Sequence, residues 1–247
     1  MKFIENVAYS NVDTSQVLDV YLPDSDVRCV FVYFHGGGLT GGNKGVAKKF
    51  ASYVTERNVA LVSANYRLYP NANFPDFIYD AAGAVAWTYD YMQKALDCDK
   101  LLVGGSSAGG YLSMMLCFDK RYLGSVGLDN SVIYGYFHDA GQPTAHYNVL
   151  NQAGIDPKRI IVDEKAPIYF VGMEKEYPIM RFIVSDNDME NRYEQTMLML
   201  STLKHFGYSN YDCVVRSGTH CKYVKAIDED GQSSFGKMIC DFAQKFI

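Results

Sequence analysis

The stretch LLVGGSSAGGYLSMML, residues 101–116, constrains the fold of this chain more than any other. An apolar run typical of a buried strand passes into a helical apolar pattern through a join that contains four glycines and two serines. The pattern G-x-S-x-G centres on Ser107, with Gly105 and Gly109 two positions to either side. Side chains at those two positions would collide in a sharp strand-to-helix turn, so the glycines predict a turn that presents the Ser107 hydroxyl at a sheet edge. Centring the pattern on Ser106 instead loses the second glycine, so we favour Ser107.

Apolar patterns predict strands and helices in alternation along the whole chain, without repeats or linkers. This order is typical of a single α/β domain, residues 1–247, with a mostly parallel sheet and helices on both faces. In such sheets, active sites gather beyond the carboxyl ends of the strands. The predicted strands are 3–9, 17–22, 29–34, 60–65, 101–104, 131–134, 180–185 and 213–216, and the predicted helices are 46–57, 77–96 with Asp76 as its cap, 108–118, 192–206 and one that begins at Ser233 or Ser234.

Four motifs fall directly after predicted strands: HGGG, GSSAGG, SDND and SGTH. They are therefore expected to meet at one edge of the sheet. The stretch 135–166 is long, polar and irregular, and we expect it to form a lid-like insertion over that edge.

Composition excludes several classes of protein. The net charge is −5 and the basic residues are scattered, which disfavours nucleic acid as a partner. No stretch approaches the roughly 20 apolar residues of a membrane span, and the first ten residues lack a signal core, so we expect a cytoplasmic protein. The six cysteines form no C-x-x-C pair, which predicts neither a zinc nor a redox site, and we expect them to be reduced.

HGGG at 35–38, NYRLYP at 65–70 and GSSAGGY at 105–111 together resemble the hormone-sensitive-lipase-like branch of the α/β-hydrolases, including its small bacterial carboxylesterases. The resemblance implies the α/β-hydrolase fold and a backbone oxyanion hole. Its donors would be Gly37 and Gly38, together with Ala108, whose N–H lies free at the start of a helix. The resemblance also implies structural roles for His35 and Arg67. Asn65 departs from the acidic residue that often stands first in the second motif, which weakens any ion pair there.

The resemblance implies a Ser–Asp–His order for the catalytic residues, with Ser107 as the nucleophile. Three carboxylates follow the strand 180–185, and the family spacing favours Asp188 over Asp186 and Glu190. The base is His220, which follows the last predicted strand and a glycine. The remaining histidines fit less well: His205 lies near a helix end, while His138 and His146 lie in the expected lid and could touch substrate. Cys221 is interpreted as a filler.

The predicted activity is hydrolysis of small-molecule esters with short acyl groups, acetylated sugars among the candidates, through an acyl-enzyme that needs no metal or cofactor. Short acyl chains are expected because the first strand starts almost at the first residue, which leaves no room for an N-terminal helical cap. Two alternatives remain open: an arylformamidase or other amide hydrolase, and a ligand-binding protein on a hydrolase scaffold.

Overall fold

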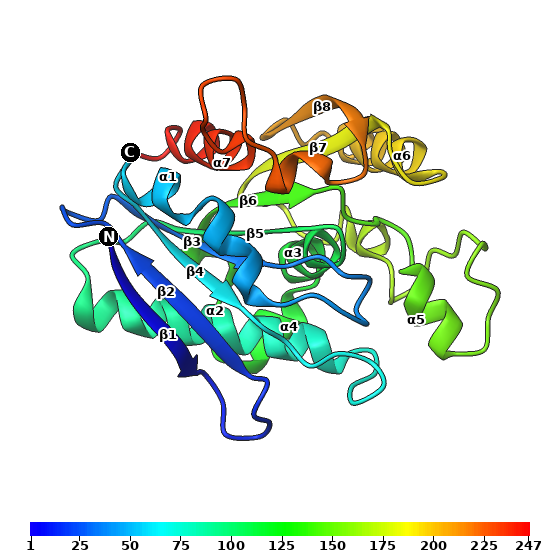
Figure 1. Ribbon diagram of the computed structural model, residues 1–247. Coiled ribbons are helices and arrows are strands. Elements are labelled where there is room, and N and C mark those ends of the chain that lie inside the picture. Colours follow the sequence, from blue (N-terminus) through cyan, green and yellow to red (C-terminus); the bar gives the residue numbers. More distant parts are fainter.

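The structure, a computed structural model, describes residues 1–247 and is built around one eight-stranded sheet (Figure 1). The strand order is β1-β2-β4-β3-β5-β6-β7-β8. β1 and β2 are antiparallel to their neighbours, and the six strands from β4 to β8 run parallel. The predicted α/β-hydrolase architecture, a mostly parallel sheet, is therefore confirmed. The strands are β1 Lys2–Ala8, β2 Val17–Leu22, β3 Cys29–Phe34, β4 Val59–Ala64, β5 Leu101–Ser106, β6 Ile133–Asp139, β7 Ile179–Asn187 and β8 Tyr211–Thr219.

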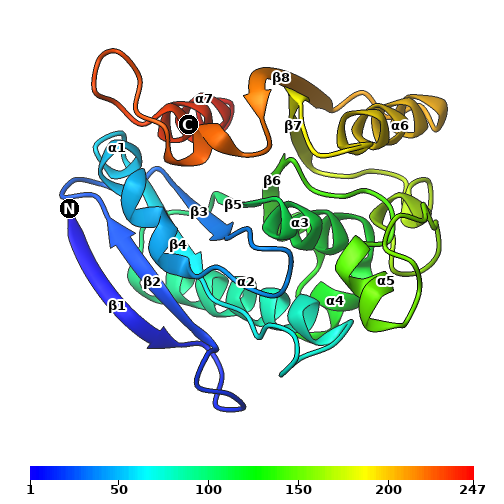
Figure 2. The ribbon, with the colours of Figure 1, turned by 45° about the vertical axis from the view of Figure 1, so that its right-hand side comes forward.

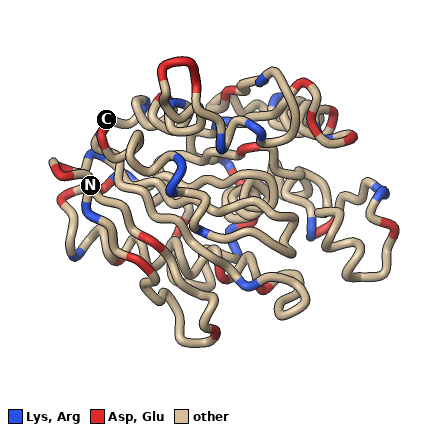
Figure 3. Tube along the Cα trace, in the orientation of Figure 1, with Lys and Arg blue, Asp and Glu red and all other residues tan.

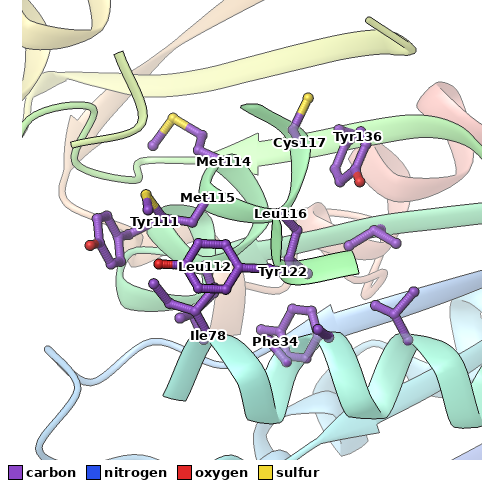
Figure 4. Close-up of a cluster of buried hydrophobic side chains, with 14 of the residues drawn as sticks. Phe34, Ile78, Tyr111, Leu112, Met114, Met115, Leu116, Cys117, Tyr122 and Tyr136 are labelled. Atoms are coloured by element: carbon purple, nitrogen blue, oxygen red, sulfur yellow. The ribbon is translucent and has the colours of Figure 1, made fainter. Parts of the chain in front are cut away.

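Two apolar cores lie on opposite faces of the sheet. In β3, Val32 and Phe34 face the larger core, while Phe31 and Tyr33 face the smaller one. Both faces of the central strands are therefore buried, which explains their continuous apolar runs. Helices α2, α3, α4 and α6 cover the larger core, whereas α1 and α7 cover the smaller one (Figures 1 and 2). In the larger core, the side chains of α3 pack against α2 and the sheet (Figure 4).

The five predicted helices are all present, two of them with differences, whereas the short helices α4 (Lys120–Ser125) and α5 (Tyr147–Gln152) lie where no helix is predicted. The predicted helix 46–57 is divided, because a 3-10 helix ends at Lys49 and a short α-helix follows it. Asp76 is the first residue of its helix rather than a side-chain cap, and its carboxylate accepts a hydrogen bond from Asn73 N at 3.2 Å. The helical elements are η1 Lys44–Lys49, α1 Ala51–Thr55, α2 Asp76–Ala95, α3 Ala108–Phe118, α4 Lys120–Ser125, η2 Asn130–Val132, α5 Tyr147–Gln152, η3 Pro167–Phe170, α6 Arg192–His205, η4 Lys222–Lys225 and α7 Ser234–Ala243.

The expected lid begins later than predicted. Residues 135–139 belong to β6, which pairs with both β5 and β7 in the middle of the sheet. Their polar side chains conceal the strand in the sequence, but they are buried and hydrogen-bonded: His138 to Ser113, and Asp139 to Tyr223. The inserted segment is therefore 140–166, and it carries α5 beyond the carboxyl ends of the parallel strands (Figure 1).

The six cysteines are all free thiols, as the sequence predicts. None of the helices combines the length and the apolar character that a bilayer span requires.

Candidate functional site

A cavity of about 970 Å³ lies beyond the carboxyl ends of the parallel strands. Residues that follow β3, β5 and β8 line it, among them Gly37, Ser107 and His220. The structure thus brings the motifs after these three strands to one edge of the sheet. The loop after β7 joins them through Met189, which also lines the cavity.

The join between β5 and α3 has the sharp turn that its glycines predict. Ser107 has φ 55° and ψ −112°, a left-handed conformation that is costly for a residue with a side chain. A Cβ on Gly105 would lie 2.5 Å from the backbone of Gly109, and one on Gly109 would lie 1.9 Å from the carbonyl oxygen of Phe34. Since neither distance is sterically possible, only glycine allows α3 to approach β3 and β5 so closely.

The two serines of the turn have different surroundings. The Ser107 hydroxyl oxygen lies 2.8 Å from His220 Nε2. Ser106 is buried, and its hydroxyl oxygen accepts a hydrogen bond from Tyr33 Oη at 3.1 Å. The geometry therefore favours Ser107 as the nucleophile.

His220 joins Ser107 to Asp188. The His220 Nδ1–H group donates to Asp188 Oδ1 at 2.5 Å, which leaves Nε2 as an acceptor for the Ser107 hydroxyl. Asp188 is further held by the backbone N–H groups of Met189 at 2.7 Å and Ser185 at 3.1 Å. Burial alone would raise the pKa of Asp188, but the hydrogen bonds from His220 and from the two backbone groups outweigh it and hold the pKa below its usual value. Asp188 is therefore a carboxylate at neutral pH.

Asp186, the competing carboxylate, faces away from this arrangement. It is exposed, and its Oδ1 accepts a hydrogen bond from Gly218 N at 2.9 Å. This contact ties the β7 loop to the β8 loop and does not reach His220. The spacing argument for Asp188 over Asp186 therefore agrees with the geometry.

Three backbone N–H groups near Ser107 are free of any partner within the chain: those of Gly37, Gly38 and Ala108. Gly37 and Gly38 have φ values of 132° and 64°, in the region that favours glycine. Ala108 is the first residue of α3, where the helix dipole is positive. Free donors at such a position can stabilise a developing oxyanion.

The residues with expected structural roles have structural contacts. His35 stacks on Tyr66 at 4.5 Å and donates from Nδ1 to Gly36 O at 2.8 Å, and burial lowers its pKa to about 4. Arg67 forms a bidentate ion pair with the buried Asp80. Asn65 accepts a hydrogen bond from the backbone N–H of Lys44 at 2.6 Å and forms no ion pair, as its departure from the acidic residue implies.

His138 and His146 do not face the cavity, contrary to the expectation that they could touch substrate. His138 lies on β6 inside the core, and burial lowers its pKa to about 3. His146 is also buried and accepts a hydrogen bond from Asn148 N at the start of α5. Both side chains are therefore neutral packing residues.

No signal in the sequence predicts the contact between the inserted segment and the oxyanion loop. Asn148 Nδ2 donates to Gly38 O at 2.5 Å, and a Cβ on Gly38 would lie 2.7 Å from Tyr147 Oη. These two residues of α5 therefore hold the loop that carries two of the free N–H groups.

A second buried carboxylate, Asp139, lies at the end of β6 beside the turn. Its carbonyl oxygen accepts from Ser107 N at 2.7 Å, and its carboxylate accepts from Tyr223 Oη. Burial raises its pKa to about 6, although hydrogen bonds from Ser106 and Tyr223 oppose the rise. The Cys221 sulfur lies 3.9 Å from this carboxylate and 3.7 Å from His220 Nε2, so Cys221 fills the space between them. Asp139 is the last residue of a strand that its polar residues conceal, so no local signal in the sequence points to it.

Comparison with known proteins identifies the family of this chain. A model of the alpha/beta hydrolase fold family matches residues 31–169, more than half of the chain. The chain belongs to the α/β-hydrolase fold family. The matched part of this α/β-hydrolase begins within β3 and contains the turn at Ser107 and β6.

Curated relatives of this α/β-hydrolase match between about two fifths and more than four fifths of the chain. Esterase LipI of Mycobacterium tuberculosis is 32% identical over 107 residues, which are 41% of this chain and 32% of LipI. An AB hydrolase superfamily protein of Schizosaccharomyces pombe is 36% identical over 96 residues, 38% of this chain and 28% of the relative. Neutral cholesterol ester hydrolase 1 of Rattus norvegicus is 26% identical over 226 residues, 84% of this chain and 53% of the relative. The chain thus spans about half or less of the length of these relatives.

Solved structures share the fold over almost the whole chain. A thermophilic esterase of Thermogutta terrifontis with bound propionate has a TM-score of 0.77 at 20% identity, covering 98% of this chain and 93% of its own. A truncated carbohydrate esterase from gut microbiota has a TM-score of 0.78 at 20% identity, covering 99% and 96%. This α/β-hydrolase therefore shares its overall fold with both esterases.

Proposed function

We propose that this α/β-hydrolase is a serine carboxylesterase that acts on small esters with short acyl chains. The observation that carries the proposal is the hydrogen-bonded chain from Ser107 through His220 to Asp188, next to three backbone N–H groups without partners. Such a chain activates a hydroxyl, and the free donors suit the charge that develops on a carbonyl oxygen. The curated relatives described as ester hydrolases support the same reaction class.

In the acylation step, Ser107 Oγ attacks the ester carbonyl carbon while His220 Nε2 takes its proton. The carbonyl oxygen becomes an oxyanion, which accepts hydrogen bonds from the N–H groups of Gly37, Gly38 and Ala108. Asp188 holds His220 in the required tautomer and stabilises the imidazolium. The tetrahedral intermediate then collapses, and His220 gives its proton to the departing alcohol oxygen.

In the deacylation step, a water molecule attacks the acyl-enzyme carbonyl carbon, and His220 takes one of its protons. The second intermediate collapses, the bond to Ser107 Oγ breaks, and His220 returns the proton to Ser107. The products are a carboxylic acid and free enzyme. Every proton transfer uses His220, so none of these steps requires a metal or cofactor.

The lining of the cavity supports a preference for short acyl groups. Polar and charged residues such as Asn43, Lys49 and Lys222 interrupt the apolar residues of the lining, which does not suit a continuous apolar tunnel. A tunnel would add about 0.8 kcal/mol of transition-state binding per methylene. Without one, kcat/KM should peak early in a series of acyl lengths and then fall. Propionate and butyrate are bound in structures of the Thermogutta esterase, and the proposal extends that class of acyl group to this chain.

The test is kcat/KM for nitrophenyl esters with acyl chains from two to twelve carbons, together with acetylated sugars and the matching anilides. We expect a maximum from acetyl to butyryl, with esters turned over much faster than anilides. Ser107→Ala should lower the rate by about 10⁴-fold or more, whereas Ser106→Ala should retain most activity. A maximum at eight carbons or beyond contradicts the short-acyl proposal, and equal losses in the two variants contradict the role of Ser107.

A further inference from the structure

Three lysines line the same cavity as Ser107 and His220: Lys49, Lys222 and Lys225. The lining contains no aspartate or glutamate. Figure 3 shows basic and acidic positions interspersed along the trace of a molecule whose net charge is −5. The charge of the cavity lining is therefore positive, whereas the net charge of the chain is negative.

The secondary structure directs the lysines toward one another. Lys222 and Lys225 are the first and last residues of the 3-10 helix η4, and side chains three residues apart in such a helix lie on the same face. Lys49 ends η1, which packs against η4. Two neighbouring elements thus present three ammonium groups to one space.

No carboxylate lies within 4 Å of any of these three ammonium groups. The other lysines of η1 are paired, Lys44 with Asp19 at 2.6 Å and Lys48 with Glu5 at 3.1 Å. Asp188, the acidic residue close to His220, is buried and engaged by it. Like charges that share a cavity repel one another, and this cavity has no internal counter-charge.

We propose that the substrate is an ester that carries an anionic group, a carboxylate or a phosphate, which the lysines bind while Ser107 attacks the ester carbonyl. This inference rests on the proposed esterase function and adds the charge of its substrate. Lysines at the mouth of a cavity raise the local concentration of anions and accelerate their association, and salt weakens the effect. The three exposed lysines therefore select among esters without taking part in bond breaking.

The experiment compares acetyl esters of matched size: 4-acetoxybenzoate and 4-acetoxyphenyl phosphate against the neutral 4-acetoxybenzamide. A second pair places the charge in the acyl part, nitrophenyl hydrogen adipate against its neutral methyl-ketone analogue. We expect kcat/KM for at least one charged ester to exceed that for its neutral partner by about tenfold at low salt. This ratio should fall as salt is added. The two charged acetates distinguish carboxylate from phosphate.

The variants are Lys49→Gln, Lys222→Gln and Lys225→Gln, with Lys48→Gln as the matched control because its ammonium is paired with Glu5 outside the cavity. Each cavity variant should lower kcat/KM for the preferred anionic ester by about twofold to fivefold and leave the neutral ester unchanged. The control should change neither.

Equal or slower turnover of every charged ester overturns the inference. So does a preference for the charged ester that survives in the variant that combines all three cavity substitutions. Turnover of the neutral esters reports on the esterase proposal separately. If neutral esters are hydrolysed in a Ser107-dependent way and the charged ones are not preferred, only the inference about charge fails.

Discussion

The turn at Ser107 and the inserted segment 140–166 both border the reactive edge of the sheet, yet different forces determine them. The turn is set by local sterics, because a Cβ at Gly109 would lie 1.9 Å from a backbone oxygen. The inserted segment is set by distant contacts, such as that of Asn148 with Gly38, 110 residues apart in the chain. A site can thus combine one part that its own residues dictate with another that only the folded chain defines.

The largest expected effect is a loss of catalytic rate when Asp188, the acidic partner of His220, is changed. Asp188→Asn should lower kcat on the order of 10⁴-fold, because the amide no longer fixes the tautomer of His220. Asp186→Asn is the matched control, since Asp186 contacts only Gly218 N, and it should retain activity within about threefold. Steady-state kinetics on a short nitrophenyl ester measures both. If Asp186→Asn is the more damaged enzyme, the assignment of the acid is wrong.

Two glycine substitutions, one in the turn and one in the inserted segment, should differ in their effect on the free energy of unfolding. Gly109→Ala should lower the free energy of unfolding by about 3 kcal/mol or prevent folding, since α3 must move away from β3. Gly154→Ala, in the inserted segment, has open space around it and only a left-handed φ of 71°, so its cost should be about 1 kcal/mol. Urea unfolding followed by circular dichroism measures both values. Equal losses would contradict the claim that close packing, rather than φ alone, fixes the turn.

The smallest effect concerns the contact from α5 to the oxyanion loop. Asn148→Ala removes the hydrogen bond to Gly38 O and should lower kcat by about tenfold, less than the loss of a direct oxyanion donor. Asn151→Ala, an exposed position on the same helix, is the matched control and should leave kcat unchanged. The same rate in both variants would show that the inserted segment does not support the loop.

The contrast between local and long-range contacts explains which elements of the fold can be predicted from the sequence. The strands β2 and β3 and the helix α3 agree with the predicted ranges because continuous apolar runs and turn glycines are local signals. Residues 135–139 of β6 read as part of a lid because His138 and Asp139 are polar, and their hydrogen bonds to Ser113 and Tyr223 are invisible in the sequence. A polar strand buried in a sheet is recognised only when its partners are known.

The same reasoning holds for the site. Ser107, His220 and Asp188 each follow a predicted strand, so topology predicts that their loops meet, while the family resemblance selects Asp188 among the three carboxylates of its loop. The surroundings of that triplet, Asn148 on α5 and the buried Asp139, come from segments whose positions depend on tertiary packing. Candidate site residues in loops that follow strands can therefore be predicted from the sequence, whereas the side chains that support those loops cannot.

Reaction of the protein with a nitrophenyl alkylphosphonate, followed by peptide mapping in a mass spectrometer, tests the central claim most directly. The account predicts one phosphonyl group per chain, on Ser107, formed at the same rate in Ser106→Ala and absent in Ser107→Ala. Loss of the label in His220→Gln would tie its formation to the proposed base. A label on Ser106 or Cys221, or no label while esters are still hydrolysed, would contradict the account.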